Sequence, residues 1–516
     1  MLRPTQLQVF RFQTRTILKR VSVKSGRMIG GTKVKRFVIG GAAAAAFCGA
    51  SALAADLPTK APPALAPTAS CFTSFYDYIN SSAQDCPLAW SGITLYGAID
   101  IGADYVTHGV PFNGAYPQGV EPLISKNSQG ARFSLAPNGL GQSVVGIKGN
   151  EEFAQDSWFV FKLETGFDPY SMQLANGPRS LIENNGNILA NQSANGDSSR
   201  AGQAFNSEAY AGLSNKTFGT LTGGRLNSLT LDTVTAYDPM GGSYAFSAFG
   251  ASGKTTGVGD SEDARYNTAV KYMVNIGQFR AGGLYQFGGY SQGNGSNGAY
   301  EAQIGGDFGG LSVDAIYSYV KDAVSLGNWS TSTAVATPAE MNTLNATLSN
   351  NSSILLFAKY TVGPVKLFGG YGYVRFQNPS DDYVNGFTSL GGYTVAANSV
   401  LPGSVTYTAY TIDRIAQVFW TGARYSILSN LDIAGAYYHF DQNDYDTSPC
   451  TGSGVNTSSS KCAGTKDLVS VMIEYHPLKR LDIYGGVQYS QGSAGLVSGY
   501  LNANYVGPTI GMRLLF

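Results

Sequence analysis

The stretch Ile93–Val106 reads ITLYGAIDIGADYV and alternates between two kinds of side chain. Its odd positions are apolar or small, as at Leu95 and Ile99, whereas its even positions include Asp100 and Asp104. Successive side chains of a β-strand point to opposite faces of the sheet. The stretch therefore predicts a strand with one face suited to lipid and the other suited to water.

The chain ends on a stretch with the same period, YVGPTIGMRLLF at 505–516. Counting back by twos from Phe516 reaches Met512 and Ile510, whereas Arg513 lies on the other face. The half-buried last strand of any β-sandwich would show the same alternation. These residues alone therefore leave the fold open, and the rest of the chain has to decide it.

Alternating segments of about 9 to 13 residues recur from Gly92 to the end, separated by connections rich in Gly, Asn, Ser and Asp. The expected strands are 93–106, 131–149, 158–167, 205–213, 219–225, 264–274, 278–290, 300–308, 311–321, 353–361, 365–376, 414–425, 431–440, 467–475, 481–489 and 504–516. This pattern predicts an all-β fold of about 16 strands.

Short and long connections alternate along this series. Tight connections lie at 274–278, 308–311, 361–365, 425–431 and 475–481, and long ones at 226–263, 322–352, 377–413 and 441–466. Such asymmetry is typical of transmembrane antiparallel β-barrels, which have short periplasmic turns and long extracellular loops. Lipid offers no partner to an open sheet edge, so the sheet must close, and closure at about 16 strands leaves an aqueous channel.

A soluble array of β-sandwiches is the alternative, and it predicts more charge and more proline within the strands. Only 13% of the 516 residues are charged and 12% are aromatic, with 65 Gly and 32 Tyr. Soluble chains carry about 25% charged residues, and helical membrane proteins need runs of about 20 apolar residues. The composition favours a barrel whose outward faces are apolar and whose inward faces are polar on average.

The N-terminal residues have the pattern of a secretory signal. An apolar run, 37–55, follows the basic stretch TKVKRF and leads into ASALAAD, so cleavage is expected after Ala54. A retained membrane helix is the alternative, and the short length and the Ala and Gly content of the run argue against it. Residues 1–27 are basic and free of acid, which indicates an extended n-region or a start site set too far upstream.

Removal of residues 1–54 changes the charge of the chain. It takes away ten of the 34 Lys and Arg residues and none of the 34 Asp and Glu residues. The remaining chain has 24 basic and 34 acidic side chains, a net charge of about −10. Nucleic acids bind proteins of the opposite sign, so no nucleic-acid partner is expected.

Cysteine positions predict two local disulfides, because disulfides persist in exported proteins. Cys71 is expected to pair with Cys86, and Cys450 with Cys462. A zinc site is the alternative for the second pair, but the spacing is not CxxC and His439 is the only histidine near it in sequence.

The chain therefore divides into three expected regions. Residues 1–54 form the signal peptide, and residues 55–91 form a periplasmic linker with a disulfide loop. The linker, DLPTKAPPALAPTAS at 56–70, is rich in Pro and Ala, which favours an extended chain. Residues 92–516 form the barrel domain.

Several motifs, taken in order, resemble the general trimeric porins of Gram-negative outer membranes. They are GITLYGAIDIGADY at 92–105, VVGIKGNEEF at 144–153, FKLETGFD at 161–168, AYAGLSNKTFGTLTGGRLNS at 209–228 and the terminal Phe516. CFTSFYDY at 71–78 and DCPLAWSGITLYG at 85–97 resemble the alphaproteobacterial, rhizobial-type branch of these porins.

This resemblance implies a 16-stranded barrel in the outer membrane, in contact with lipid and lipopolysaccharide, and a homotrimer. It implies that the third extracellular loop folds into the lumen and narrows it. It also implies that the C-terminal aromatic residue, Phe516, is the signal that the barrel-insertion machinery reads.

The candidate for the third loop is the long connection 226–263. Its carboxylates are Asp232, Asp238, Asp260, Glu262 and Asp263, against a single Lys254. Folded inward, this loop would present acid at the narrowest point of the channel. Basic residues on the facing wall would then create a transverse field that orients solutes and sets ion preference.

The candidates for this basic wall are Arg225, Arg265, Lys271 and Arg280. In the stretch ARYNTAVKYMV, Arg265 and Lys271 share one parity, whereas Tyr266 and Tyr272 share the other. The alternation predicts that Arg265 and Lys271 face the lumen and that the two tyrosines face lipid. Each charge could also be a solvated rim residue.

Arg225 matches the family's GR at the start of the third loop, but it is in phase with Leu221. It faces water only if a bulge or the strand end intervenes. Val144 and Ser207 occupy positions where the family often has arginine. Both departures weaken the expected basic wall and leave ion selectivity open.

No catalytic site, metal or cofactor is expected. The histidines are His108, His439 and His476, and no GxSxG, HExxH or phosphate-loop motif occurs. The predicted function is passive diffusion of small hydrophilic solutes and ions through a water-filled channel. A substrate-selective channel and a plugged adhesion or recognition barrel are the alternatives.

Overall fold

The structure is a computed structural model, and it describes residues 72–107, 131–170, 172, 174, 204–252, 265–287, 298–328, 344–379, 389–390, 393–396, 404–457, 459, 461–498 and 502–516. The chain divides into a unit of residues 1–66 and a compact unit of residues 67–516. All described residues belong to the second unit, so the expected signal peptide lies outside them. Within the described part of the chain, no helix has the length and apolarity needed to cross a membrane.

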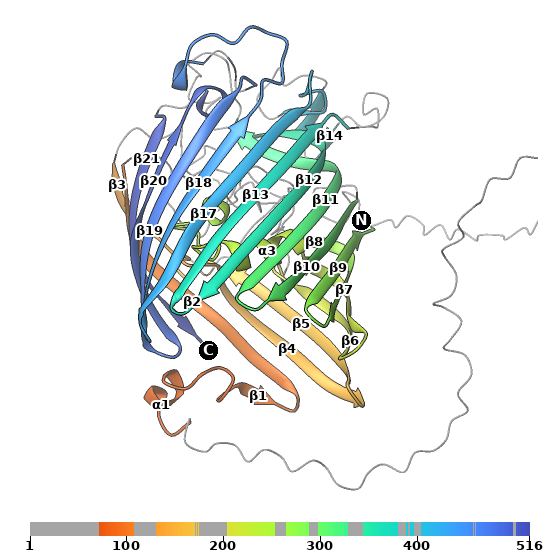
Figure 1. Ribbon diagram of the computed structural model, residues 1–516, viewed down its shortest axis with the longest axis vertical. Coiled ribbons are helices and arrows are strands. Elements are labelled where there is room, and N and C mark those ends of the chain that lie inside the picture. The colour runs from red at the N-terminus through yellow and green to blue at the C-terminus, as the bar shows by residue number, and fades with distance from the viewer. Residues whose placement is uncertain are drawn as a thin grey trace, which may run out of the picture. The chain divides into compact units, whose positions relative to one another are not determined.

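Sixteen antiparallel strands form a closed β-barrel (Figure 1). They are β2 (Ile93–Val106), β4 (Ser143–Ala154), β5 (Ser157–Phe167), β6 (Ala209–Asn215), β7 (Gly219–Asn227), β8 (Arg265–Ile276), β9 (Phe279–Gln286), β10 (Ala299–Phe308), β11 (Leu311–Asn328), β12 (Leu344–Val362), β13 (Val365–Gln377), β17 (Arg414–Leu428), β18 (Leu431–Gln442), β19 (Gly464–Leu478), β20 (Leu481–Gly492) and β21 (Asn504–Leu515). The barrel closes where β21 pairs with β2, from Leu515 opposite Ala98 to Thr509 opposite Asp104. The expected fold is confirmed.

Shorter elements lie outside the ring of barrel strands or in its connections. They are α1 (Phe75–Ile79), β1 (Leu88–Trp90), β3 (Arg132–Leu135), α3 (Leu229–Tyr237), α4 (Ala248–Ser252), β14 (Ser389–Leu390), β15 (Tyr393–Ala396), β16 (Ser404–Thr406) and the short helices η4 (Gly454–Asn456) and η5 (Ala494–Val497). Figure 1 shows α3 within the ring of strands.

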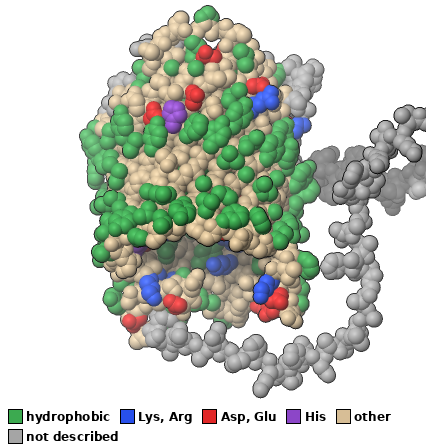
Figure 2. All heavy atoms as spheres, viewed as in Figure 1, with side chains coloured by type: hydrophobic (Ala, Val, Ile, Leu, Met, Phe, Trp, Pro, Cys, Tyr) green, Lys and Arg blue, Asp and Glu red, His purple; other side chains and the backbone are tan. Residues whose placement is uncertain are grey.

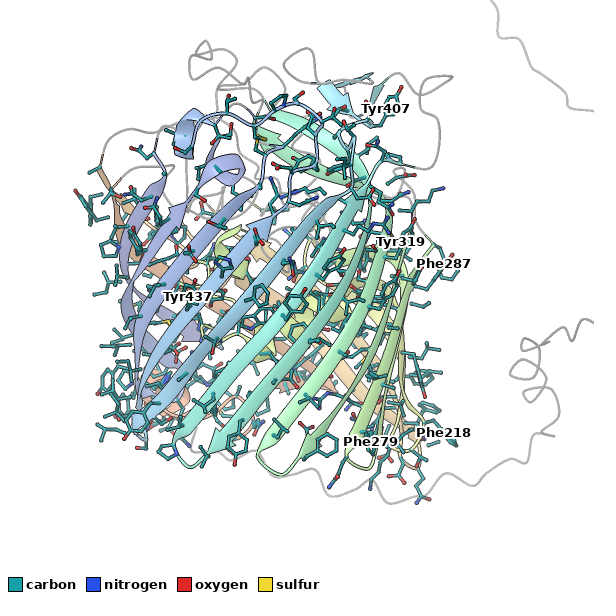
Figure 3. All side chains as sticks on the ribbon, turned by 45° about the horizontal axis from the view of Figure 1, so that its top comes forward. Phe218, Phe279, Phe287, Tyr319, Tyr407 and Tyr437 are labelled. Atoms are coloured by element: carbon teal, nitrogen blue, oxygen red, sulfur yellow. A yellow bond between two sulfur atoms is a disulfide. The ribbon has the colours of Figure 1, made fainter. Side chains whose placement is uncertain are left out.

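The outward faces of β2 and β21 are the apolar ones that the alternation predicts. Ile99 and Ile510 are 37% and 63% exposed, whereas Asp100 is fully buried. Figure 2 shows hydrophobic side chains gathered in bands around the barrel, with charged side chains above and below them. Aromatic residues lie at two levels of the barrel: Phe218 and Phe279 lie low in Figure 3, and Phe287 and Tyr319 lie higher. Such girdles lie at the two membrane interfaces of a barrel.

The strand expected at 131–149 is instead two strands, β3 and β4, with a bend between them. Asp100 holds this bend, because its Oδ2 accepts the backbone N–H groups of Leu140 at 2.7 Å and of Gly141 at 3.2 Å. Asn138 lies in the bend with φ of 64°. The flanking stretches 133–135 and 145–147 keep the same parity, so alternation alone joined them into one strand.

The long connection expected at 322–352 is mostly strand. β11 extends to Asn328 and β12 begins at Leu344, and their pairing continues through Leu326 opposite Ala346. This extension is rich in Ser, Asn and Thr, so its alternation of hydrophobicity ends while its backbone hydrogen bonds continue. A sequence criterion based on apolar alternation therefore ended both strands too early.

The inward faces, which were expected to be polar on average, also carry apolar side chains. Phe357 on β12, Trp420 on β17 and Leu468 on β19 point inward and are buried. They belong to one apolar cluster with Phe246 and Phe249 from the connection after β7. A segment that packs against the inside of the wall needs apolar side chains there, because burying unpaired polar groups is costly.

Candidate functional site

The connection after β7 packs against the barrel strands, and its residues 228–252 are described. Ser228 caps α3, since its Oγ accepts the N–H of Leu231 at 2.9 Å. Glu301 on β10 accepts the N–H of Leu229 at 2.5 Å and the hydroxyl of Thr230 at 3.1 Å. These bonds fix the start of the segment against β10.

The C-terminal end of α3 is held by strands farther around the ring. Tyr237 donates its hydroxyl proton to Asp314 on β11 at 2.6 Å, and its carbonyl accepts the indole N–H of Trp420 on β17 at 3.2 Å. Lys359 on β12 lies over the Tyr237 ring, with its Nζ 5.1 Å from the centroid. Neighbouring inward side chains of β11, β12 and β17 thus converge on one residue.

Asp238 follows α3 and is 3% exposed. Its carboxylate accepts the hydroxyl of Tyr438 on β18 at 2.5 Å and the N–H of Gly242 at 2.6 Å. Burial raises the pKa of the Asp238 carboxyl, and these two hydrogen bonds act in the opposite direction. Asp238 therefore lies against the protein wall and not toward solvent.

The far part of the segment contacts the wall on both sides of the β21–β2 pairing that closes the barrel. Ala245 donates its N–H to the carbonyl of Gly139 at 3.0 Å. The ring of Phe246 lies edge-on to Tyr484 on β20, with 6.2 Å between centroids. Phe249 packs edge-on against Trp420 at 5.1 Å. The segment is therefore fixed to the wall along its whole described length.

Asp232 is the exposed acid of this segment. Its side chain is 46% exposed, and its Oδ2 lies 2.9 Å from Nζ of Lys271 on β8. The amide of Asn227 also donates to Asp232, at 2.9 Å. The structure thus brings together one predicted loop acid and one predicted wall base.

A bulge lies at Arg225, where the register between β7 and β8 shifts between Gly224 and Leu226. The side chain of Arg225 is only 6% exposed. Its guanidinium donates to the Asn267 side chain at 2.7 Å and to the Asn206 carbonyl at 2.7 Å. Arg225 therefore braces the wall at this point and presents little charge to solvent.

The same bulge overturns the placement of Tyr266. The alternation predicted that Tyr266 faces lipid, but it is fully buried and belongs to the inner apolar cluster. On β8, two residues oppose Arg225 alone, and one of them, Thr268, has φ of 49°. An inserted residue reverses the parity of every position beyond it. Lys271 and Tyr272 lie on the unaffected side of the bulge and keep their predicted faces.

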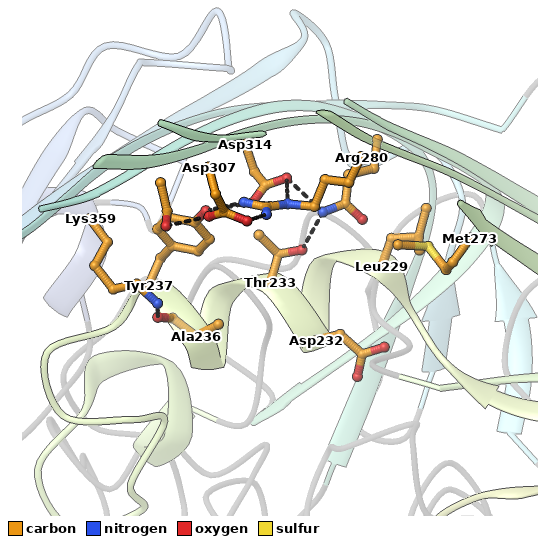
Figure 4. Close-up of a pocket in the computed structure, with 12 residues that line it drawn as sticks. Leu229, Asp232, Thr233, Ala236, Tyr237, Met273, Arg280, Asp307, Asp314 and Lys359 are labelled. Atoms are coloured by element: carbon orange, nitrogen blue, oxygen red, sulfur yellow. Dashed lines mark hydrogen bonds and ion pairs between the residues drawn. The ribbon is translucent and has the colours of Figure 1, made fainter. Parts of the chain in front are cut away.

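Arg280 on β9 is held in a network and is not a free wall cation. Its guanidinium binds Asp314 at 2.7 Å, Asp307 at 2.6 Å and the hydroxyl of Tyr237 at 2.7 Å. A cavity of about 400 Å³ lies beside this network, between α3 and strands β8–β12. Figure 4 shows Arg280 between the two aspartates, with Lys359 on the other side of Tyr237.

The remaining predicted constriction residues divide into two groups. Asp260 and Glu262, with Asp263 and Lys254, lie outside the described residues. Arg265 begins β8 opposite Asn227 and is half-buried.

Sequence reasoning missed a charged group on β4–β6. Lys148 and Lys162 lie directly opposite each other on β4 and β5. Nζ of Lys162 is 2.6 Å from Glu208 and 3.1 Å from Glu164. The ring of Tyr96 lies between the lysines, with its centroid 5.1 Å and 5.8 Å from their Nζ atoms.

This group had a readable sequence signal. Lys148 lies in the motif VVGIKGNEEF, and Lys162 and Glu164 lie in FKLETGFD. All three occupy the inward parity of their strands. Ser207, at a position where arginine was expected, donates its hydroxyl proton to Glu164. The lysines thus supply positive charge on a wall where two family arginines are absent.

The structure confirms the disulfide between Cys450 and Cys462, whose Cα atoms are 5.8 Å apart. It excludes zinc binding by these two sulfur atoms, although Asp444 lies near them. Cys86 also belongs to a disulfide, and its predicted partner, Cys71, lies outside the described residues. Phe516 exchanges two backbone hydrogen bonds with Gly97, at 2.9 and 3.0 Å.

Both described histidines bind carboxylates. Nδ1 of His439 lies 2.7 Å from Asp467, and Nδ1 of His476 lies 2.7 Å from Asp482. His108 lies outside the described residues. Neither of the two described imidazoles is bonded to a serine hydroxyl.

The lumen thus has two unlike sides. Most strand residues of the apolar cluster lie on β11–β20, where they pack with the segment 228–252. On β4–β8 the inward side chains include the exposed Lys148 and the half-buried Lys162 and Lys271. Lys271 binds the exposed Asp232. The exposed side chains of Lys148 and Asp232 therefore offer charge to solvent on the second side.

Comparison with known proteins gives a family and a fold. A family model described as Gram-negative porin matches residues 41–495. An outer membrane porin protein of Bordetella pertussis is 25% identical over 200 residues, which make up 39% of this chain and 43% of that protein. This match spans less than half of the relative's length.

Two solved structures of OmpT, an outer membrane protein of Vibrio cholerae, have the same fold. The in-vitro folded form gives a TM-score of 0.50 at 14% identity, over 83% of this chain and 99% of that chain. The outer-membrane expressed form gives a TM-score of 0.50 at 13% identity, over 83% of this chain and 100% of that chain.

Proposed function

Because the chain belongs to the Gram-negative porin family, we propose that small hydrophilic solutes and ions cross its barrel by passive diffusion, along the side formed by β4–β8. The family and the closed barrel make it a channel of the outer membrane. The single observation that carries the proposed path is the contrast between the two sides of the lumen. Apolar side chains are packed together on one side, and charged side chains remain accessible on the other.

The proposed constriction lies between Asp232 on α3 and the lysines of the facing wall. Lys271 lies 2.9 Å from Asp232, and Lys148 and Lys162 are farther along the same wall. Opposed charges across a narrow aqueous gap create a transverse field that orients dipolar solutes. In this proposal Asp238, Arg225 and Arg280 position the segment and the wall, and Asp232 supplies the acid that solutes meet.

Single-channel recording in a planar lipid bilayer tests the proposal. The purified protein should insert and give stepwise increases of current that are linear with voltage at low voltage. Protein that is recovered from the bilayer or from sealed vesicles has inserted. If such inserted protein carries no current, the result would contradict a diffusion channel. That result would favour the plugged recognition barrel. In such a barrel the polar side of the lumen would be closed as well as the side filled by the apolar cluster.

A substrate-selective channel is the second candidate, and the cavity beside α3 favours it. The cavity offers the exposed carboxylate of Asp307, the ammonium of Lys359 and the ring of Tyr237 within about 400 Å³. A solute that carries both charges and an apolar part has partners for each of them there. Transient block of the open-channel current by such a solute, and not by a sugar of equal size, would identify this function.

We further propose three copies in the assembled channel and membership of the alphaproteobacterial, rhizobial-type branch. Both rest on the family resemblance, the second on the motifs at 71–78 and 85–97. Light scattering coupled to size-exclusion chromatography measures the number of copies after subtraction of detergent, and a mass of one or two chains would exclude a trimer.

Residues 1–54 are proposed to be removed on export, which leaves 55–91 as a periplasmic segment before the barrel. N-terminal sequencing of protein from isolated outer membranes should begin at Ala55. We expect no enzymatic activity, because both described histidines bind carboxylates and not a nucleophile that they could activate.

A further inference from the structure

Arg480 lies in the tight turn between β19 and β20, yet its side chain is only 1% exposed. The residues that bury it are far away in sequence. Its guanidinium donates to the carbonyls of Tyr78 at 3.1 Å, Ser81 at 2.9 Å, Ser82 at 3.1 Å and Cys86 at 2.5 Å. Four carbonyls from α1 and the turn after it therefore surround one cation.

Two further contacts tie the same turn to both neighbours. The backbone N–H of Arg480 donates to the carbonyl of Ile79 at 3.1 Å, and its own carbonyl accepts the N–H of Leu515 at 2.8 Å. The guanidinium also lies 4.2 Å from the centre of the Tyr78 ring. Arg480 thus joins the N-terminal segment to the last residues of β21.

The N-terminal segment has a second attachment on β2. β1 pairs with the start of β2, with Leu88 opposite Leu95 and Trp90 opposite Ile93. Along the same edge of β2, the next residue after Leu95 that forms backbone hydrogen bonds is Gly97, and its partner is Phe516. β1 therefore continues the edge of β2 from the point where β21 ends.

From these contacts we infer that residues 72–90 are a latch that holds the closing seam of the barrel shut at its periplasmic rim. The latch binds the β19–β20 turn through Arg480 and pairs with β2 through β1. It therefore bridges the seam between β21 and β2. This function is separate from conduction, because none of these contacts involves the polar side of the lumen.

The seam is where a latch has the largest effect. It joins the first and last strands of the barrel, so its pairing closes the longest loop and bears the largest loop-closure entropy. Its ladder with β21 runs from Ala98 to Asp104, and outside that range it is continued by the bonds of Gly97 to Phe516 and of Thr107 to Val506.

The interior of the latch is built to hold Arg480. Ser74 caps α1 by accepting the N–H of Asp77, and Ser82 accepts the N–H of Asp85 in the following turn. These local bonds orient the carbonyls toward the guanidinium. Cys86 is 1% exposed and is cross-linked by a disulfide.

Hydrogen exchange of the full-length protein in detergent, read by mass spectrometry, tests the latch. In Arg480→Gln, peptides that contain 93–104 and 509–516 should exchange about tenfold faster, as expected when charge-assisted hydrogen bonds are lost. Peptides from β10–β12, across the barrel, should keep their rates. The control is Lys479→Gln in the same turn, whose ammonium lies 3.8 Å from Asp85 and is 60% exposed.

Two outcomes would overturn the latch. Unchanged exchange of both seam peptides in Arg480→Gln would show that the contacts do not hold the seam. Equal acceleration in every strand would show a general loss of stability. If Arg480→Gln does not assemble, Arg480→Lys and Cys86→Ser are measured instead: each should accelerate the seam peptides selectively, and unchanged or uniform rates would count against the latch.

Discussion

Lys271 on β8 binds Asp232 on α3, with 2.9 Å between Nζ and Oδ2, and this ion pair links the barrel wall to the segment within the lumen. The Asp232 side chain is 46% exposed, whereas that of Lys271 is 12% exposed. The acid therefore meets passing ions more directly than the base does. Two acids of the same segment should consequently behave differently when they are neutralised.

Asp232→Asn should move the reversal potential in a salt gradient toward anion preference, because it removes an exposed negative charge. Asp238→Asn should leave the reversal potential near that of the wild type, because Asp238 is 3% exposed and bonds to Tyr438 and Gly242. Equal shifts from the two variants would contradict the placement of Asp232 alone at the constriction.

Lys148→Met should move the reversal potential toward cation preference. Lys148 has no carboxylate partner among the described residues, so the variant leaves no acid unpaired. Lys162→Met should shift the potential in the same direction, but it also leaves Glu164 and Glu208 without their ion pairs.

Lys162→Met should therefore also lower the unfolding temperature of the barrel, measured as the temperature at which its electrophoretic mobility changes. Lys148→Met should lower this temperature less. A single unpaired buried carboxylate costs about 1–3 kcal/mol or more. A lower melting temperature in both variants, with no change of potential, would mean that the lysines serve the wall and not the solute path.

Phe249→Ala should loosen the segment 228–252. Phe249 packs edge-on against Trp420 at 5.1 Å and against Tyr438 at 5.3 Å, inside the apolar cluster. Loss of a buried phenylalanine typically costs about 3–5 kcal/mol. Larger and noisier single-channel currents are expected, and Phe279→Ala, on the outward face, is the control. A current like that of the wild type would show that the cluster does not hold the segment.

Cys450→Ser combined with Cys462→Ser should destabilise the loop between β18 and β19. The disulfide closes a separation of 12 residues, and its removal is expected to cost about 2–4 kcal/mol. Protease added to intact cells should cut the variant within 443–463 faster than it cuts the wild type. Equal rates would show that the contacts of buried Cys462 and its neighbours hold the loop without the cross-link.

The strands could be predicted from the sequence because a lipid-facing strand must alternate strictly. The observed β2 coincides with the expected 93–106, and β21 lies within the expected 504–516. A bulge was considered at Arg225, but its effect on the face of Tyr266 was not predicted. Neither the bulge that turns Tyr266 inward nor the bend held by Asp100 changes the alternation of residue types.

The candidate site was predicted less completely, for a different reason. Asp232 and Lys271 were identified by type and parity, and the structure brings them together. Whether Asp238 is exposed depends on Tyr438, which is 200 residues away in sequence. The inward placement of Lys148 and Lys162 could have been predicted from the alternation alone, because both occupy inward positions on neighbouring strands.

The most direct test of the proposed path is single-channel recording with a charged thiol reagent on two variants that each gain one free cysteine. The first variant is Lys148→Cys, at a position on the polar side of the lumen. The second is Leu468→Cys, at a position of β19 inside the apolar cluster. A negatively charged methanethiosulfonate should change the current of the first variant and leave that of the second unchanged. Modification that alters the current only at position 468 would contradict a passage along β4–β8.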